Sequence, residues 1–111
     1  MHLKNFSMIN ENNSWSLSPA YDLLNVHIVN PRDTEELALT LEGKKKKLRK
    51  EHFERFGKGL DLTERQIEGT FTRIAKNKTL AFGWIQNSFL SADYQKAYLT
   101  LLEERYSVLL R

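Results

Sequence analysis

The chain has 111 residues, the size of one ordinary domain and too short for two independent cores. Hydrophobic residues make up 41% and charged residues 28%, a balance that excludes a disordered chain. The lack of cysteine excludes a disulfide framework and a thiolate zinc site. No apolar run reaches the length of a membrane span or a signal peptide. We therefore expect a cytoplasmic protein with no membrane partner.

The net charge of +3 is concentrated in one run, the four lysines at 44–47, which Arg49 and Lys50 extend. A run of this kind can contact nucleic acid phosphates or an acidic partner. The other interpretation is a solvated surface turn, which is favoured because basic clusters are common and carry little specificity. We therefore do not expect direct binding of nucleic acid.

The first half of the chain is typical of short strands and turns. Residues 6–9 and 15–18 flank the polar stretch 10–13, which predicts a β-hairpin, and Pro19 ends its second strand. Alternation over residues 37–41, followed by Gly43, predicts a second hairpin whose return strand carries the lysines. Between the hairpins, residues 25–33 predict an irregular connection closed by Pro31.

From residue 50 onwards the apolar spacing is helical. A short helix around residues 52–56 should stop near Gly57 and Gly59. Thr63 and Gln66 predict a capping box ahead of a second helix. Residues 80–89 should be largely buried, and Ser91 is the expected N-cap of a helix that runs to the C-terminus.

These elements predict an α+β fold, with small N-terminal β-hairpins packed on a bundle of three to four helices. We expect a single domain over residues 1–111, with a hairpin and metal-loop region at 1–49 and a helical region at 50–111. The predicted core consists of Phe6, Trp15, Leu17, Phe53, Phe56, Ile67, Phe71, Ile74, Phe82, Trp84, Ile85, Phe89, Tyr94, Tyr98, Leu101 and Leu102.

The candidate functional residues lie at the two ends of the first hairpin. A hairpin returns the chain to its start, so the amide of Asn5 and the carboxylate of Asp22 should come close together. Amide and carboxylate oxygens suit Mg²⁺, which takes one or two protein ligands and completes its shell with water and phosphate. Taken singly, both residues are also common turn formers.

Two strings surround these residues, HLKNFS at 2–7 and LSPAYDLL at 17–24. Together they resemble the catalytic loop and metal loop of HipA-type toxin kinases, the serine/threonine kinases of bacterial toxin–antitoxin modules. Further similarity covers ELALTL at 36–41, GK at 43–44, HF at 52–53, SFLS at 88–91, Tyr98 and ER at 104–105. The resemblance therefore spans essentially the whole chain, as the second half of a kinase-like C-terminal lobe.

The resemblance implies a role for several residues. Asn5 would be the catalytic-loop metal ligand, and Asp22 the second metal ligand. Tyr21 occupies the aromatic position beside that aspartate, while His2 and Lys4 would support the loop. The complete kinase would use Mg²⁺ and ATP, with weak or no binding by this chain alone. Its implied partners are a helix-turn-helix antitoxin and a protein substrate of the translation machinery, with glutamate-tRNA ligase as the familiar example.

One departure from the family pattern is decisive for activity. The aspartate that acts as catalytic base would stand immediately before Met1, and the nucleotide-binding lobe has no counterpart in these 111 residues. We therefore expect no kinase activity from the chain alone, and a missing N-terminal kinase portion as a partner. A lobe cut in this way exposes apolar surface, so a homodimer is a further expectation. The alternative function is a non-catalytic docking module that binds a kinase, an antitoxin or nucleic acid.

Overall fold

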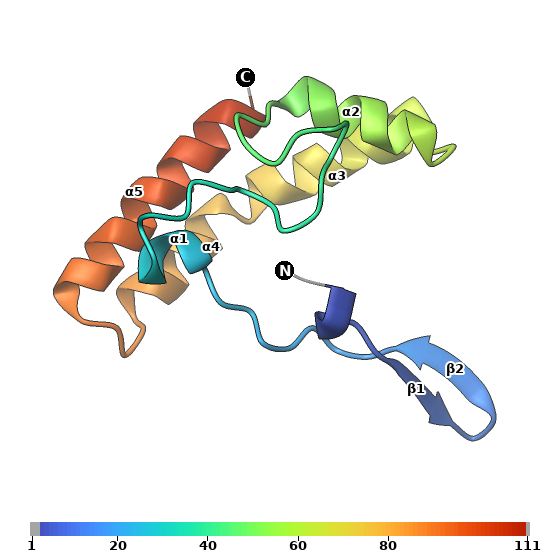
Figure 1. Ribbon diagram of the computed structural model, residues 1–111, viewed down its shortest axis with the longest axis horizontal. Coiled ribbons are helices and arrows are strands. Elements are labelled where there is room, and N and C mark those ends of the chain that lie inside the picture. The colour runs from blue at the N-terminus through green and yellow to red at the C-terminus, as the bar shows by residue number, and fades with distance from the viewer. Residues whose placement is uncertain (1–2, 111) are drawn as a thin grey trace.

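The computed structural model describes residues 3–110, and Figure 1 shows a hairpin followed by helices. The elements in chain order are the 3-10 turn η1 (Leu3–Asn5), β1 (Met8–Glu11), β2 (Ser14–Leu17), α1 (Val26–Val29), α2 (Lys50–Gly59), α3 (Glu64–Lys76), α4 (Lys78–Gln86) and α5 (Ala92–Leu109). The predicted α+β class is confirmed. Among residues 3–110, no helix combines the length and apolarity needed to cross a bilayer.

The first hairpin forms as predicted, but its first strand is shifted by two residues: Asn10 and Glu11, predicted to lie in the loop, pair in the ladder, and the loop shrinks to two residues. Asn12 and Asn13 make the two-residue turn with φ of 52° and 61°, the left-handed values that a type I′ turn requires and that asparagine tolerates. Glu11 pairs with Ser14 beside the turn. Beyond the strands, the Ser18 N–H donates to the Ser7 carbonyl at 2.8 Å. The pairing therefore extends to the base of the hairpin, where the two candidate loops begin.

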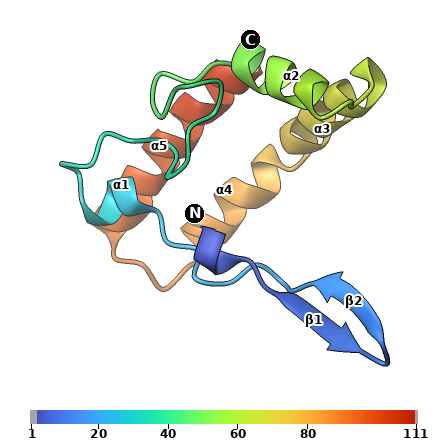
Figure 2. The ribbon, with the colours of Figure 1, turned by 45° about the vertical axis from the view of Figure 1, so that its right-hand side comes forward.

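The hairpin does not pack on the helices as expected. Every residue of β1 and β2 is exposed, and both ribbon views show the hairpin projecting away from the helical part (Figures 1 and 2). The prediction that Phe6, Trp15 and Leu17 lie in the core is wrong, since their exposed fractions are 51%, 65% and 61%. These three residues are apolar, but no helix or strand in the part of the chain that the structure describes covers their side chains.

The predicted second hairpin is reduced to one turn with an isolated bridge between Leu41 and Lys44. Instead of a ladder, the Glu36 carboxylate holds the returning chain: it accepts the Lys47 N–H at 2.9 Å and the Leu48 N–H at 3.1 Å. The same carboxylate pairs with Arg105 of α5 at 3.0 Å. Side-chain bonds of this kind compete with strand pairing for backbone donors, which explains why no second strand forms.

The connection at 25–33, predicted to be irregular, contains the short helix α1. The Asn25 side chain accepts the Ile28 N–H at 3.3 Å and thereby caps it. The cap residue is typical of a helix start, but four residues are too few to produce a readable apolar period. α1 lies against α5.

The helix boundaries follow local signals. α2 ends at Gly59, and the capping box of α3 is confirmed: Thr63 Oγ1 accepts the Gln66 N–H at 3.3 Å, while Gln66 Oε1 accepts the Thr63 N–H at 2.8 Å. Ser91 Oγ accepts the Tyr94 N–H at 3.5 Å at the start of α5. α3 leads into α4, and α5 runs back alongside α4 (Figure 1).

The interior of the described chain is small. Its buried apolar residues are Leu41, Leu48, Ile67 and Tyr106. Of the predicted core, Ile67 is buried, whereas the following residues are exposed, against the prediction: Phe56, Trp84, Phe89 and Tyr94. The total accessible surface is 9029 Å², whereas a self-contained monomer of this mass exposes about 6,300 Å². The radius of gyration, 16.0 Å, likewise exceeds the roughly 13 Å of a compact domain. The chain thus exposes surface that a larger assembly would bury.

The contact between α2 and α3 gives a paired prediction of stability. A Cβ added at Gly57 would stand 2.9 Å from Ile67 Cγ1, whereas at Gly69 it would meet no atom within 4 Å. Gly57→Ala should therefore lower the free energy of unfolding by about 1 kcal/mol or more, because the crowding outweighs the gain in helix propensity. Gly69→Ala should raise it by up to about 1 kcal/mol. Urea unfolding of both variants tests this, and a stabilising Gly57→Ala would contradict the close packing.

Candidate metal-binding loop pair

Asn5 and Asp22 meet at the base of the hairpin, as the sequence predicts. Asn5 Nδ2 donates to Asp22 Oδ2 at 3.0 Å and lies 3.5 Å from the Asp22 carbonyl oxygen. Asn5 ends the η1 turn and is 5% exposed, whereas Asp22 is an exposed residue of the chain after β2. The hairpin therefore brings together two side chains that are 17 positions apart in the sequence.

A second set of bonds fixes the two loops to each other. The Tyr21 hydroxyl donates to the Lys4 carbonyl at 2.9 Å. Since the phenol has one proton, the Ser7 hydroxyl donates to the Tyr21 oxygen at 2.7 Å. Tyr21 thus supports the loop, and Lys4 contributes through its backbone. His2 lies outside the described residues.

The backbone at Asp22 orients its carboxylate. Its φ of 52° is in the left-handed region, which aspartate tolerates better than most residues because its short side chain can bond locally. A hollow of about 330 Å³ lies beside this turn, between residues 22–25 and Tyr98. Asp22 is therefore exposed and borders open space.

Asn5 carries an amide oxygen and Asp22 a carboxylate, the kinds of oxygen that Mg²⁺ prefers as ligands. In this structure the amide nitrogen of Asn5, and not its oxygen, faces Asp22 Oδ2, at 3.0 Å. Half a turn of the Asn5 amide would present its oxygen in place of its nitrogen. No group of three or more histidine, cysteine, aspartate or glutamate side chains suited to a metal occurs in residues 3–110.

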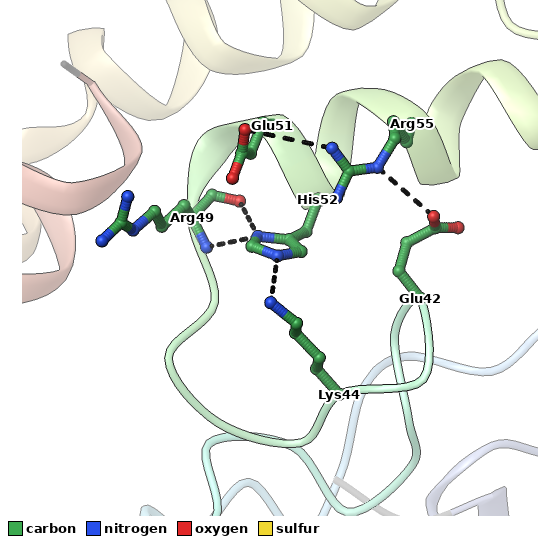
Figure 3. A network of polar contacts seen from close by, with 6 residues as sticks. All are labelled: Glu42, Lys44, Arg49, Glu51, His52 and Arg55. Carbon is green, nitrogen blue, oxygen red and sulfur yellow. Dashed lines mark hydrogen bonds and ion pairs between the residues drawn. The ribbon is translucent and has the colours of Figure 1, made fainter.

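Sequence reasoning missed a second polar cluster, which surrounds the N-terminus of α2 (Figure 3). His52 is 3% exposed, and its Nδ1 lies 3.0 Å from the Arg49 backbone nitrogen, while its Nε2 lies 3.1 Å from Lys44 Nζ. A side-chain acceptor at the third helical position is a recognised capping signal, but it is normally a glutamate or glutamine. Because His52 is neither of these residues, the sequence pattern did not indicate a capping box at the start of α2.

The comparisons define the class of protein. The family model described as the HipA-like C-terminal domain matches residues 1–81. The chain therefore belongs to the HipA-like C-terminal domain family, and the predicted resemblance is confirmed over residues 1–81. The similarity predicted at 88–91, Tyr98 and 104–105 lies beyond this match and stays a prediction. The match includes both candidate loops and ends within α4. The comparison with curated proteins finds no match.

Proposed function

We propose that this chain is the metal-binding portion of a HipA-like protein serine/threonine kinase, an enzyme of ATP-dependent phosphoryl transfer to a protein. The observation that carries the proposal is the contact of Asn5 with Asp22, 3.0 Å across the base of the hairpin. An asparagine and a later aspartate that hold Mg²⁺ on either side of a short hairpin are recurring parts of kinase active sites. Membership of the family supports the same assignment.

The residues of this chain would hold and orient the ion. Asn5, after half a turn of its amide, and Asp22 would supply one oxygen each. Tyr21 holds the two loops together through its bonds to Lys4 and Ser7. When bound, Mg²⁺ neutralises charge on the transferring phosphate. Because phosphoryl transfer depends mainly on positioning and charge, a loop pair fixed before nucleotide arrives contributes directly to the rate.

The 111 residues contain no aspartate in the loop position of the catalytic base. The proposed enzyme therefore includes a polypeptide portion that bears this aspartate and the nucleotide-binding lobe. Its substrate class is a protein of the translation machinery, and its regulator is a helix-turn-helix antitoxin. The chain alone should transfer no phosphate, because a positioned base contributes on the order of a hundred- to ten-thousand-fold.

A non-catalytic docking module is the second candidate, and a groove between α4, α5 and the 24–48 segment favours it. The groove has a volume of about 870 Å³, and Trp84, Leu101 and Leu102 are among its apolar lining residues. Exposed apolar surface of this kind is typical of protein interaction sites. The occupant would be a kinase portion, an antitoxin or a second copy of the chain, whereas the mainly apolar lining gives no reason to favour nucleic acid.

The kinase portion and the docking module predict different binding of Mg²⁺ and nucleotide. In isothermal titration of the full chain with ADP, added Mg²⁺ should raise the affinity, and Asp22→Asn should remove this increase. Asparagine preserves the shape and an acceptor for Asn5, so the loops should stay in place. Glu11→Gln removes the same charge from the exposed end of β1 and is the matched control.

No effect of Mg²⁺ on ADP binding by the native chain would count against a metal role for the Asn5–Asp22 pair. Loss of the Mg²⁺ effect in Asp22→Asn alone supports the kinase portion. An equal Mg²⁺ effect in the native chain, in Asp22→Asn and in Glu11→Gln would contradict the metal role of Asp22 and favour the docking module.

A further inference from the structure

The turn between α4 and α5 presents one large apolar side chain completely to solvent. Phe89 is 109% exposed, the highest value among the exposed large hydrophobic residues of the described chain. Both ribbon views show this turn at the outer end of the α4–α5 pair (Figures 1 and 2). Leu90 beside it is 40% exposed, and Trp84 in the last part of α4 is 71% exposed. Apolar and aromatic side chains gathered on a surface are typical of an interaction site.

Hydrogen bonds hold the backbone of this turn on both sides of Phe89. Before it, Ser88 Oγ donates to the Ile85 carbonyl at 2.7 Å, and Gln95 Nε2 donates to the Ser88 carbonyl at 3.1 Å. After it, Ser91 caps the start of α5. Phe89 is therefore presented on a fixed backbone. A segment that is already ordered loses less entropy when it binds a partner.

The groove between α4, α5 and the 24–48 segment begins directly beside this turn. Ser88 and Leu90, the two chain neighbours of Phe89, are among its lining residues. Its volume is about 870 Å³. Because hollows of about 300–1,000 Å³ hold drug-sized ligands, the groove has room for an aromatic side chain. A projecting side chain and a groove that can receive one thus lie next to each other on the same surface.

The charged residues in the groove lining are mostly paired with one another. Lys45 binds Glu35 at 3.0 Å, and Arg105 binds Glu36 at 3.0 Å. Most of the lining is apolar. The groove therefore offers no strong excess of one charge to an ionic partner, and an uncharged apolar group fits it best. Phe89 has this chemistry.

We propose that two copies of this chain form a symmetric dimer in which Phe89 of each copy inserts into the groove of the other. A twofold interface uses the same surface on both copies and makes every contact twice, and a side chain that projects beside its own groove meets this requirement. The pairing rests on the docking groove of the second candidate function and not on the metal role of Asp22.

The exposed area agrees with a second copy as the occupant. The chain exposes 9029 Å², whereas a compact monomer of its mass exposes about 6,300 Å². The difference, about 2,700 Å², is enough for one obligate interface, which buries about 1,000–2,500 Å² on each chain. A stable dimer therefore needs no surface beyond what the chain already exposes.

Sedimentation velocity of the full chain over a range of concentrations tests the pairing. The native chain should form a dimer, and Phe89→Ala should weaken it by at least about tenfold, because each dimer loses two aromatic anchors. Phe56→Ala is the matched control, since Phe56 is 44% exposed on α2 and does not line the groove. This control should leave the dissociation constant within about twofold. Both side chains are exposed, so both variants should fold, which far-ultraviolet circular dichroism checks.

A mixing experiment tests the symmetric arrangement. Trp84→Glu alters the groove and keeps Phe89, whereas Phe89→Ala keeps the groove. In a mixed dimer of these two variants, one of the two contacts has both of its native sides. The mixed dimer should therefore be at least about threefold tighter than the dimer of either variant, because a tenfold loss over two contacts is about threefold for each.

Several results would overturn the proposal. They are a native chain that stays monomeric, an unchanged dimer in Phe89→Ala, equal losses in Phe89→Ala and Phe56→Ala, and a mixed dimer no tighter than those of the two variants. None of them bears on the titration of the Asn5–Asp22 pair with Mg²⁺ and ADP, so the dimer and the metal site are tested independently.

Discussion

Glu36→Ala is expected to lower the free energy of unfolding by about 2 kcal/mol or more. The Glu36 carboxylate is 17% exposed, accepts the Lys47 and Leu48 N–H groups, and pairs with Arg105 of α5. Its removal leaves the part-buried Leu48 N–H without an acceptor, at a cost of about 1–3 kcal/mol. The exposed Lys47 N–H and the Arg105 guanidinium, which is 39% exposed, can turn to water and add less. Since small domains have total stabilities of about 5–15 kcal/mol, the variant should be partly unfolded at moderate temperature.

The adjacent residue supplies the control for this prediction. Glu35 makes the same kind of ion pair, with Lys45 at 3.0 Å, but both side chains are well exposed. Glu35→Ala should change the free energy of unfolding by less than about 1 kcal/mol. Thermal unfolding of both variants, followed by circular dichroism, measures the difference. Equal effects would show that the Glu36 carboxylate does not organise the segment between α1 and α2.

The second large effect concerns assembly. The accessible surface exceeds that of a compact monomer by about 2,700 Å², and one obligate interface buries about 1,000–2,500 Å² per chain. We therefore expect the purified chain to form a homodimer through the groove between α4 and α5. Trp84 lines this groove and is 71% exposed, so Trp84→Glu should weaken association by at least about tenfold.

Trp15 is the matched control, since it is 65% exposed but belongs to β2, in the hairpin that projects away from the helices (Figure 1). Trp15→Glu should leave the dimer intact. Sedimentation velocity over a range of concentrations measures both variants. A native chain that remains monomeric at every concentration, or dimers that depend on Trp15 and not on Trp84, would contradict this mode of assembly.

The sequence predicted best those features that short-range chemistry determines. Two consecutive asparagines produce the hairpin turn, Thr63 and Gln66 produce the capping box, and the return of the hairpin brings Asn5 to Asp22. In each case the required residues lie in or beside a single element. The family match over residues 1–81 agrees with the resemblance carried by these strings.

The failures arose where the outcome depends on distant groups. Apolar and polar residues do alternate at 37–41, but no ladder forms there. Instead, the Glu36 carboxylate binds the backbone of the returning chain and pairs with Arg105 of α5. Likewise, Trp84 is apolar and on a helix, but periodicity does not say whether another element covers it. The sequence did not predict the Lys44–His52 contact for the same reason, since the turn and the helix meet only in the folded chain.

The central claim, that Asn5 and Asp22 hold a divalent ion, is tested most directly by paramagnetic relaxation. Mn²⁺ is added in small amounts to the isotope-labelled chain in the presence of ADP, and the broadening of each amide signal is measured. The account predicts strongest broadening around residues 4–7 and 21–24, displaced by excess Mg²⁺ and absent in Asp22→Asn. Broadening centred instead on other carboxylates, such as Asp33 and Glu35, or unchanged in Asp22→Asn, would contradict it.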